Sequence, residues 1–159
     1  MKMSGRLSFK NMVSKENKLK EVGGEKVCPI TVIMRDNKLL FGCRHYSSEQ
    51  IVWTNVGGRS EIGETIEQAL RREVVEEVGI NDLEIVDFIA EVAGAKEEDI
   101  VPIFFSTTNQ DARLMEPEKF SEWRWITIDE YFNGKDYVSF NPRAREVIEN
   151  YLKNLHEEI

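Results

Sequence analysis

The chain has 159 residues, of which 41% are hydrophobic and 31% are charged, as expected for one soluble globular domain. Its formal net charge of −8 argues against general binding to nucleic acid or to anionic membranes, because such contacts require a basic surface. A polyanionic small molecule remains compatible with this charge if divalent cations screen it.

The sequence predicts a cytoplasmic protein with one folded unit. No apolar run is long enough to span a bilayer, and residues 1–24 lack the apolar core of a secretory signal. Those residues are expected to form a partly mobile N-terminal extension, followed by a single domain at residues 25–159. Cys28 and Cys43 lie in apolar stretches, which favours free buried thiols over a disulfide or a metal site.

Six runs rich in β-branched and aromatic residues predict strands. In chain order they occupy residues 26–35, 38–44, 51–55, 83–93, 99–107 and 123–128. Asp36-Asn37, between the first two runs, predicts a tight hairpin turn. Residues 45–50 are polar and residues 56–63 contain three glycines, so both segments are predicted to be loops.

Two helices are predicted among these strands. The first covers residues 65–78, where Thr65 and Gln68 match a capping box and Gly79 suits the left-handed end of a helix. The second begins at Asn141-Pro142 and carries one apolar stripe. Strands interrupted by two separated helices predict an α/β fold with a mixed sheet flanked by helices.

Three glutamates share one face of the first predicted helix. Glu73, Glu76 and Glu77 stand at i, i+3 and i+4, while a neighbouring stripe is apolar and can dock on the sheet. Like charges at this spacing repel one another, so the face requires a compensating cation, either Arg72 or a divalent metal. Hard oxygen ligands on a short arc suit Mg²⁺, which leaves room for substrate phosphates. We expect this face to be partly exposed.

Residues 58–80 satisfy every fixed position of the Nudix box. Gly58 is followed by five residues, then Glu64, seven further residues and the run Arg72-Glu73-Val74-Val75-Glu76-Glu77-Val78-Gly79-Ile80. The chain therefore resembles the Nudix hydrolase family, whose fold is a mixed β-sheet sandwiched between α-helices (α/β/α). One departure precedes the box, where Asn55-Val56-Gly57-Gly58 replaces the Leu-Pro-Gly-Gly of many members.

The resemblance implies a role for each main box residue. The Gly58 carbonyl, Glu73, Glu76 and Glu77 are implied ligands of an essential Mg²⁺, for which Mn²⁺ can substitute. Glu76 either joins them as a ligand or acts as the catalytic base. Arg72 is implied to orient a glutamate through an ion pair.

Several further residues are assigned by the same resemblance or by their charge. Glu64 is implied to stabilise the loop or to bind an outer metal. Members also tend to use an acidic residue from beyond the box, for which Glu116 or Glu118 is the expectation. Arg44 and Arg59 are candidates to bind substrate phosphates, with a surface arginine that binds no ligand as the alternative.

The implied reaction is hydrolysis of a phosphoanhydride bond in a nucleoside diphosphate linked to a moiety X. Residues 114–125 resemble the corresponding segment of MutT-like hydrolases, which favours a nucleoside triphosphate converted to a monophosphate and pyrophosphate. An ADP-ribose or nucleotide-sugar pyrophosphatase is the first alternative, although Lys96 replaces the proline typical of many ADP-ribose hydrolases. A catalytically silent, nucleotide-sensing module is the second, and such a module would be expected to lose a box glutamate.

The partners expected from the sequence are therefore small molecules. Trp123 or Trp125 either stacks on the base of a nucleotide or packs as a core residue. Neither nucleic acid nor a membrane is expected to bind. A homodimer is one expected assembly, since members of the family are often dimers.

Overall fold

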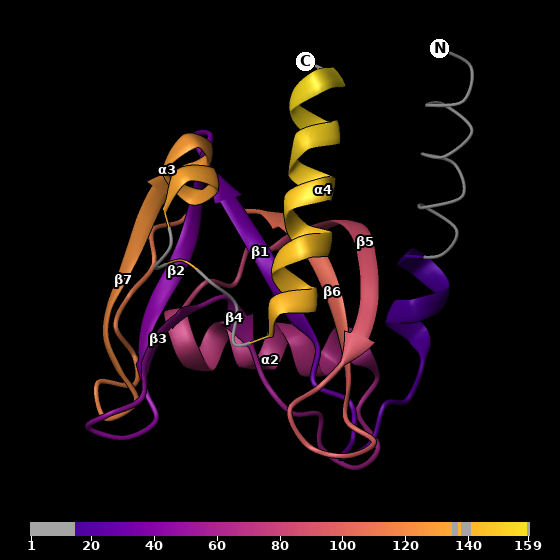
Figure 1. Ribbon diagram of the computed structural model, residues 1–159. Helices are drawn as coiled ribbons and strands as arrows, with labels where there is room; N and C mark the ends of the chain where they lie inside the picture. The colour runs from indigo at the N-terminus through magenta and orange to yellow at the C-terminus, as the bar shows by residue number, and fades with distance from the viewer. Residues whose placement is uncertain (1–14, 135–136, 138–140, 159) are drawn as a thin grey trace.

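The protein consists of a mixed sheet between helices, as Figure 1 shows for the computed structural model. The structure describes residues 15–134, 137 and 141–158. Helix α2 (Ile66–Val78) lies against one face of the sheet, and helix α4 (Pro142–Glu158) lies against the other (Figure 1). The predicted α/β class and the sandwiched sheet are confirmed.

The sheet has seven strands: β1 (Ile30–Arg35), β2 (Lys38–His45), β3 (Ile51–Thr54), β4 (Val56–Gly57), β5 (Glu84–Ala93), β6 (Ile100–Thr107) and β7 (Phe120–Thr127). Its main order is β3-β2-β1-β6-β5, while β4 pairs with β1 and β7 pairs with β2. Strands β1 and β6 run parallel, and the other pairings are antiparallel. Because β1 and β6 are parallel, β6 ends at Thr107 beside Met34 near the end of β1, whereas β4 pairs with the first two residues of β1.

The strands agree with the sequence prediction except near their ends. Asp36 and Asn37 both have positive φ, 50° and 62°, as a tight hairpin turn between twisted strands requires. The segment 56–63 was predicted to be a loop, but its first two residues form the short strand β4. Strand β7 begins at Phe120, three residues earlier than predicted.

A third helix, α3 (Ile128–Asn133), was missed because residue 128 was assigned to the last strand. The helix begins where the Thr127 side chain accepts a hydrogen bond from the Glu130 amide, and the Glu130 side chain accepts one from the Thr127 amide. This capping box is visible in the sequence at the same spacing as that of α2. It marks the point at which strand β7 ends.

Helix α2 has the boundaries that its sequence predicts. The Thr65 side chain and Gln68 form the expected capping box, and Gly79 ends the helix in the left-handed conformation, with φ of 69°. Leu70, Val74 and Val78 are fully buried against the sheet. The docking of this stripe fixes which side of α2 carries the glutamates.

Two apolar layers hold the helices on the sheet. Phe41, Ile103 and Ile148 belong to the layer under α4, and the α2 stripe packs on the other face. Within the predicted N-terminal extension at residues 1–24, residues 15–20 are helical and Leu19 packs in the α2 layer. Residues 1–14 of that extension lie outside the described part. Among the described residues, no helix has the length and apolarity needed to cross a membrane. Cys28 and Cys43 are both free; Cys43 is buried as predicted, whereas Cys28 is only partly buried.

Candidate active site

Two consecutive glycines bring the backbone close to β1 and to α2. A Cβ atom on Gly57, where φ is 155°, would lie 2.3 Å from the Pro29 carbonyl oxygen. A Cβ on Gly58 would lie 2.5 Å from the carboxyl carbon of Glu73. Real side chains do not tolerate such distances, so glycine at these positions allows the Glu73 carboxylate to lie against the loop backbone.

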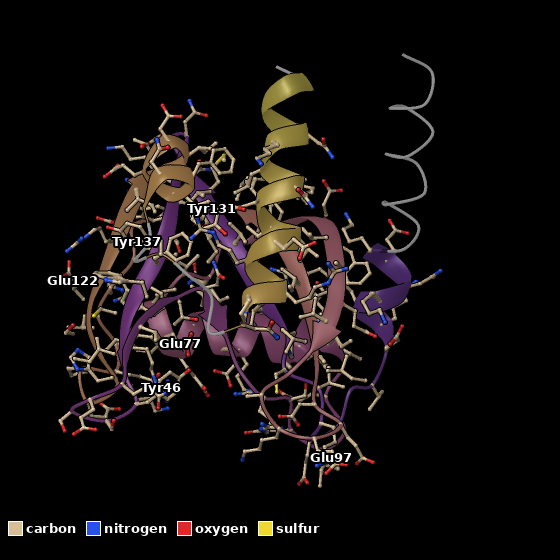
Figure 2. All side chains as sticks on the ribbon, viewed as in Figure 1. Tyr46, Glu77, Glu97, Glu122, Tyr131 and Tyr137 are labelled. Atoms are coloured by element: carbon tan, nitrogen blue, oxygen red, sulfur yellow. The ribbon has the colours of Figure 1, made fainter. Side chains whose placement is uncertain are left out.

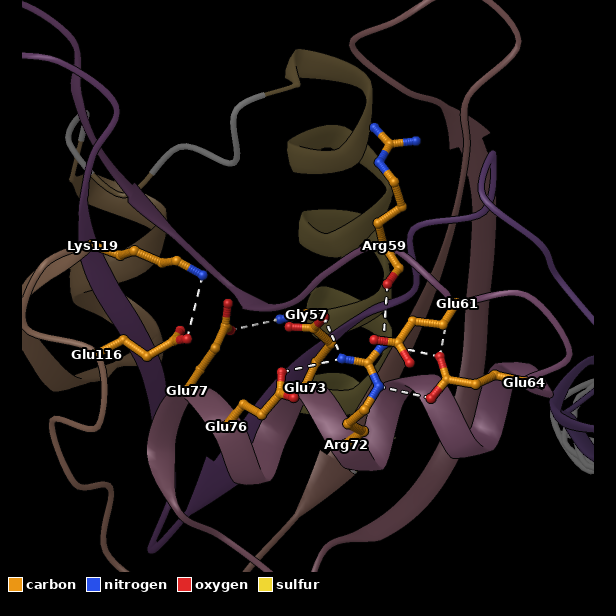
Figure 3. Close-up of polar contacts among 10 residues, drawn as sticks. All are labelled: Gly57, Arg59, Glu61, Glu64, Arg72, Glu73, Glu76, Glu77, Glu116 and Lys119. Carbon is orange, nitrogen blue, oxygen red and sulfur yellow. Dashed lines mark hydrogen bonds and ion pairs between the residues drawn. The ribbon is translucent and has the colours of Figure 1, made fainter.

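Arg72 connects the loop with three glutamates of the box, as Figure 3 shows. Its guanidinium donates two hydrogen bonds to Glu64, of 2.7 and 2.9 Å, and one each to Glu73 at 3.0 Å and Glu76 at 3.1 Å. It also donates to the backbone carbonyl of Arg59 at 3.2 Å. The hydrogen bonds from Arg72 hold the pKa of Glu64 below its usual range. One cation therefore joins the loop residue Glu64 to two glutamates of the acidic face, Glu73 and Glu76.

Glu77 is the most deeply placed carboxylate of the site. Glu77 is only 5% exposed, so the predicted partial exposure of the acidic face is wrong for this residue, which turns toward β4. The Glu76 side chain on the same face is 48% exposed. The Glu77 side chain is labelled in Figure 2, and Figure 3 shows that the Gly57 amide donates to its Oε1, at 3.1 Å. Burial, together with the charges of Glu73 and Glu116, raises the pKa of Glu77 to about 8.

An acidic residue from beyond the box also reaches the site. Glu116 belongs to the segment between β6 and β7, which is tied to the end of α2 by the Arg113 amide donating to the Val78 carbonyl at 2.9 Å. The Glu116 charge raises the pKa of both Glu73 and Glu77, although burial is the larger cause for each. Of the two acidic residues expected here, Glu116 thus acts on the box glutamates.

The donor set suits a hard divalent cation. Glu73, Glu76, Glu77 and Glu116 offer carboxylate oxygens, and the glycine loop offers backbone carbonyls, which are the ligands that Mg²⁺ and Mn²⁺ prefer. Among the described residues, no three acidic, histidine or cysteine side chains are already grouped as a metal-binding cluster. Glu77 makes no ion pair among the described residues, and burial together with the neighbouring carboxylates raises its pKa, so a divalent cation bound here would stabilise its ionised form.

Arg44 lies on β2 directly after a register shift at Gly42/Arg44, an irregularity that re-aims the following side chains. Its guanidinium carbon is 4.7 Å from the Tyr46 ring centroid and 5.3 Å from that of Phe120. Its Nε is buried and makes no hydrogen bond, and its charge opposes the raised pKa of Glu77. The Arg44 guanidinium is therefore held beside the acidic site.

The guanidinium of Arg59 is committed elsewhere. It donates to both carboxylate oxygens of Asp99, at 3.0 and 2.9 Å, and to the Glu25 carbonyl at 2.6 Å. The Asp99 hydrogen bonds raise the pKa of Arg59 and, reciprocally, lower that of Asp99. The sequence analysis missed Asp99, because no spacing pattern relates it to the box.

The tryptophans that were candidates for base stacking have protein partners. The Trp123 ring lies over Gly42, where a Cβ would be 2.6 Å away, and its centroid is 4.6 Å from that of Phe120. Trp125 Nε1 donates to Asp111 at 2.8 Å. Base stacking by Trp123 stays a prediction.

The fold and the acidic helix define an α/β protein that presents carboxylates beside a glycine loop. A family model, that of the NUDIX domain, matches residues 27–151. The chain belongs to the Nudix hydrolase family.

Curated relatives and solved structures agree with this membership. The chain is 30% identical over 108 residues to the NAD-capped RNA hydrolase NudC of Haemophilus influenzae (strain PittGG), an alignment that covers 65% of this chain and 40% of that protein. It thus spans about two fifths of the length of that relative. The crystal structure of a NUDIX hydrolase from Nitrosomonas europaea has a TM-score of 0.70 at 21% identity, covering 86% of this chain and 75% of that one.

The crystal structure of a C. elegans Ap4A hydrolase binary complex has a TM-score of 0.66 at 19% identity. The alignment covers 82% of this chain and 98% of the hydrolase. At these identities, the structural likenesses show the shared fold. They leave the substrate to be argued from the chain's own residues.

Proposed function

We propose that this chain is a divalent-metal-dependent pyrophosphohydrolase that acts on a nucleoside diphosphate linked to a further group. The observation that carries the proposal is the buried Glu77 carboxylate, which lies with Glu73 and Glu116 beside a glycine loop and makes no ion pair among the described residues. A buried carboxyl of this kind is either protonated or compensated by a cation, and a divalent metal bound beside it would keep it ionised.

The residues divide the chemical work among them. Glu73, Glu77 and the Gly58 carbonyl would hold Mg²⁺ or Mn²⁺, which when bound would neutralise charge on the phosphate oxygens, and Glu76 would act as the base. Arg72 orients Glu73 and Glu76 through its hydrogen bonds.

Glu76 is the proposed acceptor of the proton from the attacking water. The Glu76 side chain is 48% exposed, so its carboxylate is accessible to the attacking water and can accept the proton that the water loses. The water oxygen then bonds to phosphorus, and the bridging P–O bond breaks with its electron pair leaving on the second phosphate. Arg44, whose guanidinium lies near the rings of Tyr46 and Phe120, would bind a phosphate oxygen.

A nucleoside triphosphate, giving a monophosphate and pyrophosphate, is the proposed substrate. The support is the segment that carries Glu116 and leads into β7, whose sequence is similar to that of MutT-like hydrolases. An intact set of box glutamates disfavours a silent, nucleotide-sensing module, because such a module would have no need of all three.

A dinucleotide pyrophosphate of the NAD type is the second candidate substrate. It is favoured by the similarity to NudC proteins, whose name describes hydrolysis of NAD-capped RNA. The net charge of −8 disfavours contacts with a long RNA, so free NAD is the form of this substrate to test first.

A substrate panel tests the proposal. The protein is incubated with Mg²⁺ and, separately, each nucleoside triphosphate, ADP-ribose, a nucleotide sugar, diadenosine polyphosphate and NAD, and monophosphate release is followed by chromatography. Release from one class that stops on addition of EDTA supports metal-dependent hydrolysis and identifies X. Absence of product from every compound would show that the chain is not a pyrophosphohydrolase of nucleotides.

A further inference from the structure

The Arg59 side chain points away from the α2 carboxylates, although its backbone belongs to the glycine loop (Figure 3). We propose that the ion pair between Arg59 and Asp99 is a positioning device for the active site. Asp99, which lies outside the box, anchors the Arg59 side chain and thereby fixes the backbone of Gly58 and Arg59. The Gly58 carbonyl is the implied metal ligand, and the Arg59 carbonyl accepts a hydrogen bond from Arg72. This inference rests on the proposed function and adds to it two positioning residues, one of them outside the box.

The anchor is buried and hydrogen-bonded at its Asp99 end. The Asp99 side chain is 3% exposed and accepts hydrogen bonds from two nitrogens of Arg59. Its backbone is held as well, since its amide donates to the Lys96 carbonyl at 3.0 Å and its carbonyl accepts from the Gly94 amide at 2.8 Å. The turn between β5 and β6 therefore presents the carboxylate as a fixed point.

The other end of the anchor is the loop that enters the active site. The Gly58 amide donates to the Pro29 carbonyl at 3.1 Å, and the Ser60 amide donates to the Val27 carbonyl at 2.8 Å. These bonds hold the backbone on either side of Arg59, and the side chain adds a third constraint. The Arg59 carbonyl then accepts from Arg72, the residue that organises the box glutamates.

The main alternative is that Arg59 binds a substrate phosphate. That role would require the guanidinium to leave Asp99, which would strand a buried carboxylate without a partner. It would also give up the hydrogen bond to the Glu25 carbonyl. The bidentate geometry is the kind that favours a permanent pair over an exchangeable one.

A double-mutant cycle separates the two roles. Arg59→Gln, Asp99→Asn and the double variant are compared with Glu149→Gln, which alters an ion pair on α4, away from the box. If the pair positions the loop, each single variant lowers kcat about tenfold with KM changed less than about twofold, as for other residues that orient metal ligands. The double variant is no worse than either single one, and Arg59→Lys keeps part of the activity.

The opposite pattern would overturn the proposal. A phosphate ligand predicts that Arg59→Gln raises KM about tenfold or more while Asp99→Asn, which frees the guanidinium, leaves KM and kcat near those of the unmodified protein. Strictly multiplicative effects in the double variant would contradict the proposal as well, since they would mean that the two residues act separately.

A second readout does not depend on turnover. Hydrogen exchange of the Gly58 and Ser60 amides in the metal-free protein is expected to be about tenfold faster in both single variants and unchanged in Glu149→Gln. Unaltered exchange in Asp99→Asn would contradict the anchor. If no nucleotide is hydrolysed, the proposed function fails, while the exchange experiment still decides whether the pair fixes the loop.

Discussion

Helices α2 and α4 lie on opposite faces of the same sheet and use their acidic residues differently. On α4, Glu146 and Glu149 each pair with an arginine of the same helix, at 2.8 and 3.0 Å, so charges balance locally. On α2, the single Arg72 forms ion pairs with both Glu73 and Glu76, whereas Glu77 accepts a hydrogen bond from a backbone amide. The excess of buried negative charge, rather than the number of glutamates, distinguishes a candidate metal site from a solvated helix face.

Each helix also has one arginine at the centre of a network. Arg145 of α4 binds Glu149 and donates to the carbonyls of Tyr131 and Tyr137, which fastens the chain after α3. Arg72 of α2 binds side chains that the proposed chemistry uses. The two arginines are comparably shielded, with 15% and 23% of the side chain exposed, so they form a matched pair for mutagenesis.

The largest expected effect comes from Glu77→Gln. Removing the buried charge is predicted to lower kcat by more than about 100-fold, beyond the loss typical for residues that only support metal ligands. The fold should survive, because the amide is isosteric and the Gly57 amide can still donate to its oxygen. Steady-state kinetics with the substrate found in the panel, alongside circular dichroism, measures both, and Glu149→Gln is the control that keeps full activity. Equal rates in the two variants would remove Glu77 from the site.

Arg72→Lys ranks next. Lysine keeps the charge but cannot reproduce the forked contacts to Glu64, Glu73 and Glu76, so kcat is predicted to fall about 10- to 100-fold. Arg145→Lys is expected to lower the melting temperature while activity per folded molecule stays the same. Kinetics normalised to the folded fraction provides the comparison, and a similar loss of kcat in both variants would mean that the difference between the helices is not functional.

The pH dependence of stability is expected to show the unbalanced charge directly. Burial raises the pKa of Glu77 from 4.5 to about 8, so between these values the metal-free folded protein holds a proton that the unfolded chain has lost. The contribution of Glu77 therefore destabilises the fold progressively as pH rises from about 5 to 8. At pH 8, Glu77→Gln should melt at least about 3 °C higher than the unmodified protein, equivalent to about 1 kcal/mol for a chain of this length. Thermal melts in EDTA across this range test the sign, and parallel curves would refute it.

The smallest effect on activity is expected from the core under α4. Ile148 is fully buried, so Ile148→Ala should reduce the free energy of unfolding by roughly 2–5 kcal/mol through the cavity it leaves. Because the α4 layer and the acidic site lie on opposite faces of the sheet, kcat of the folded protein should stay within about twofold. Urea unfolding and kinetics below the transition measure the two quantities. A matching loss of kcat would show that the faces are coupled.

Local patterns in the sequence were sufficient for α2 and its caps, since Thr65, Gln68 and Gly79 act within one turn of the helix. The same reasoning could have found α3 from Thr127 and Glu130. The burial of Glu77 could not be foreseen, because a helical wheel gives the shared face but not which of its members meets β4.

The role of Arg59 shows the same limit more strongly. Its partner Asp99 is 40 residues away and approaches only through the pairing of β5 with β6 and of β6 with β1. Arg44 depends on a strand irregularity that its sequence does not mark. Contacts that depend on helical spacing could therefore be predicted from the sequence. Contacts that depend on sheet register could not.

Mn²⁺ binding, followed by electron paramagnetic resonance, tests most directly whether the α2 carboxylates hold a divalent metal. If these carboxylates hold the metal, Glu77→Gln weakens Mn²⁺ binding at least about tenfold, whereas Glu149→Gln binds Mn²⁺ like the unmodified protein. Equal Mn²⁺ affinity in all three proteins would contradict this assignment.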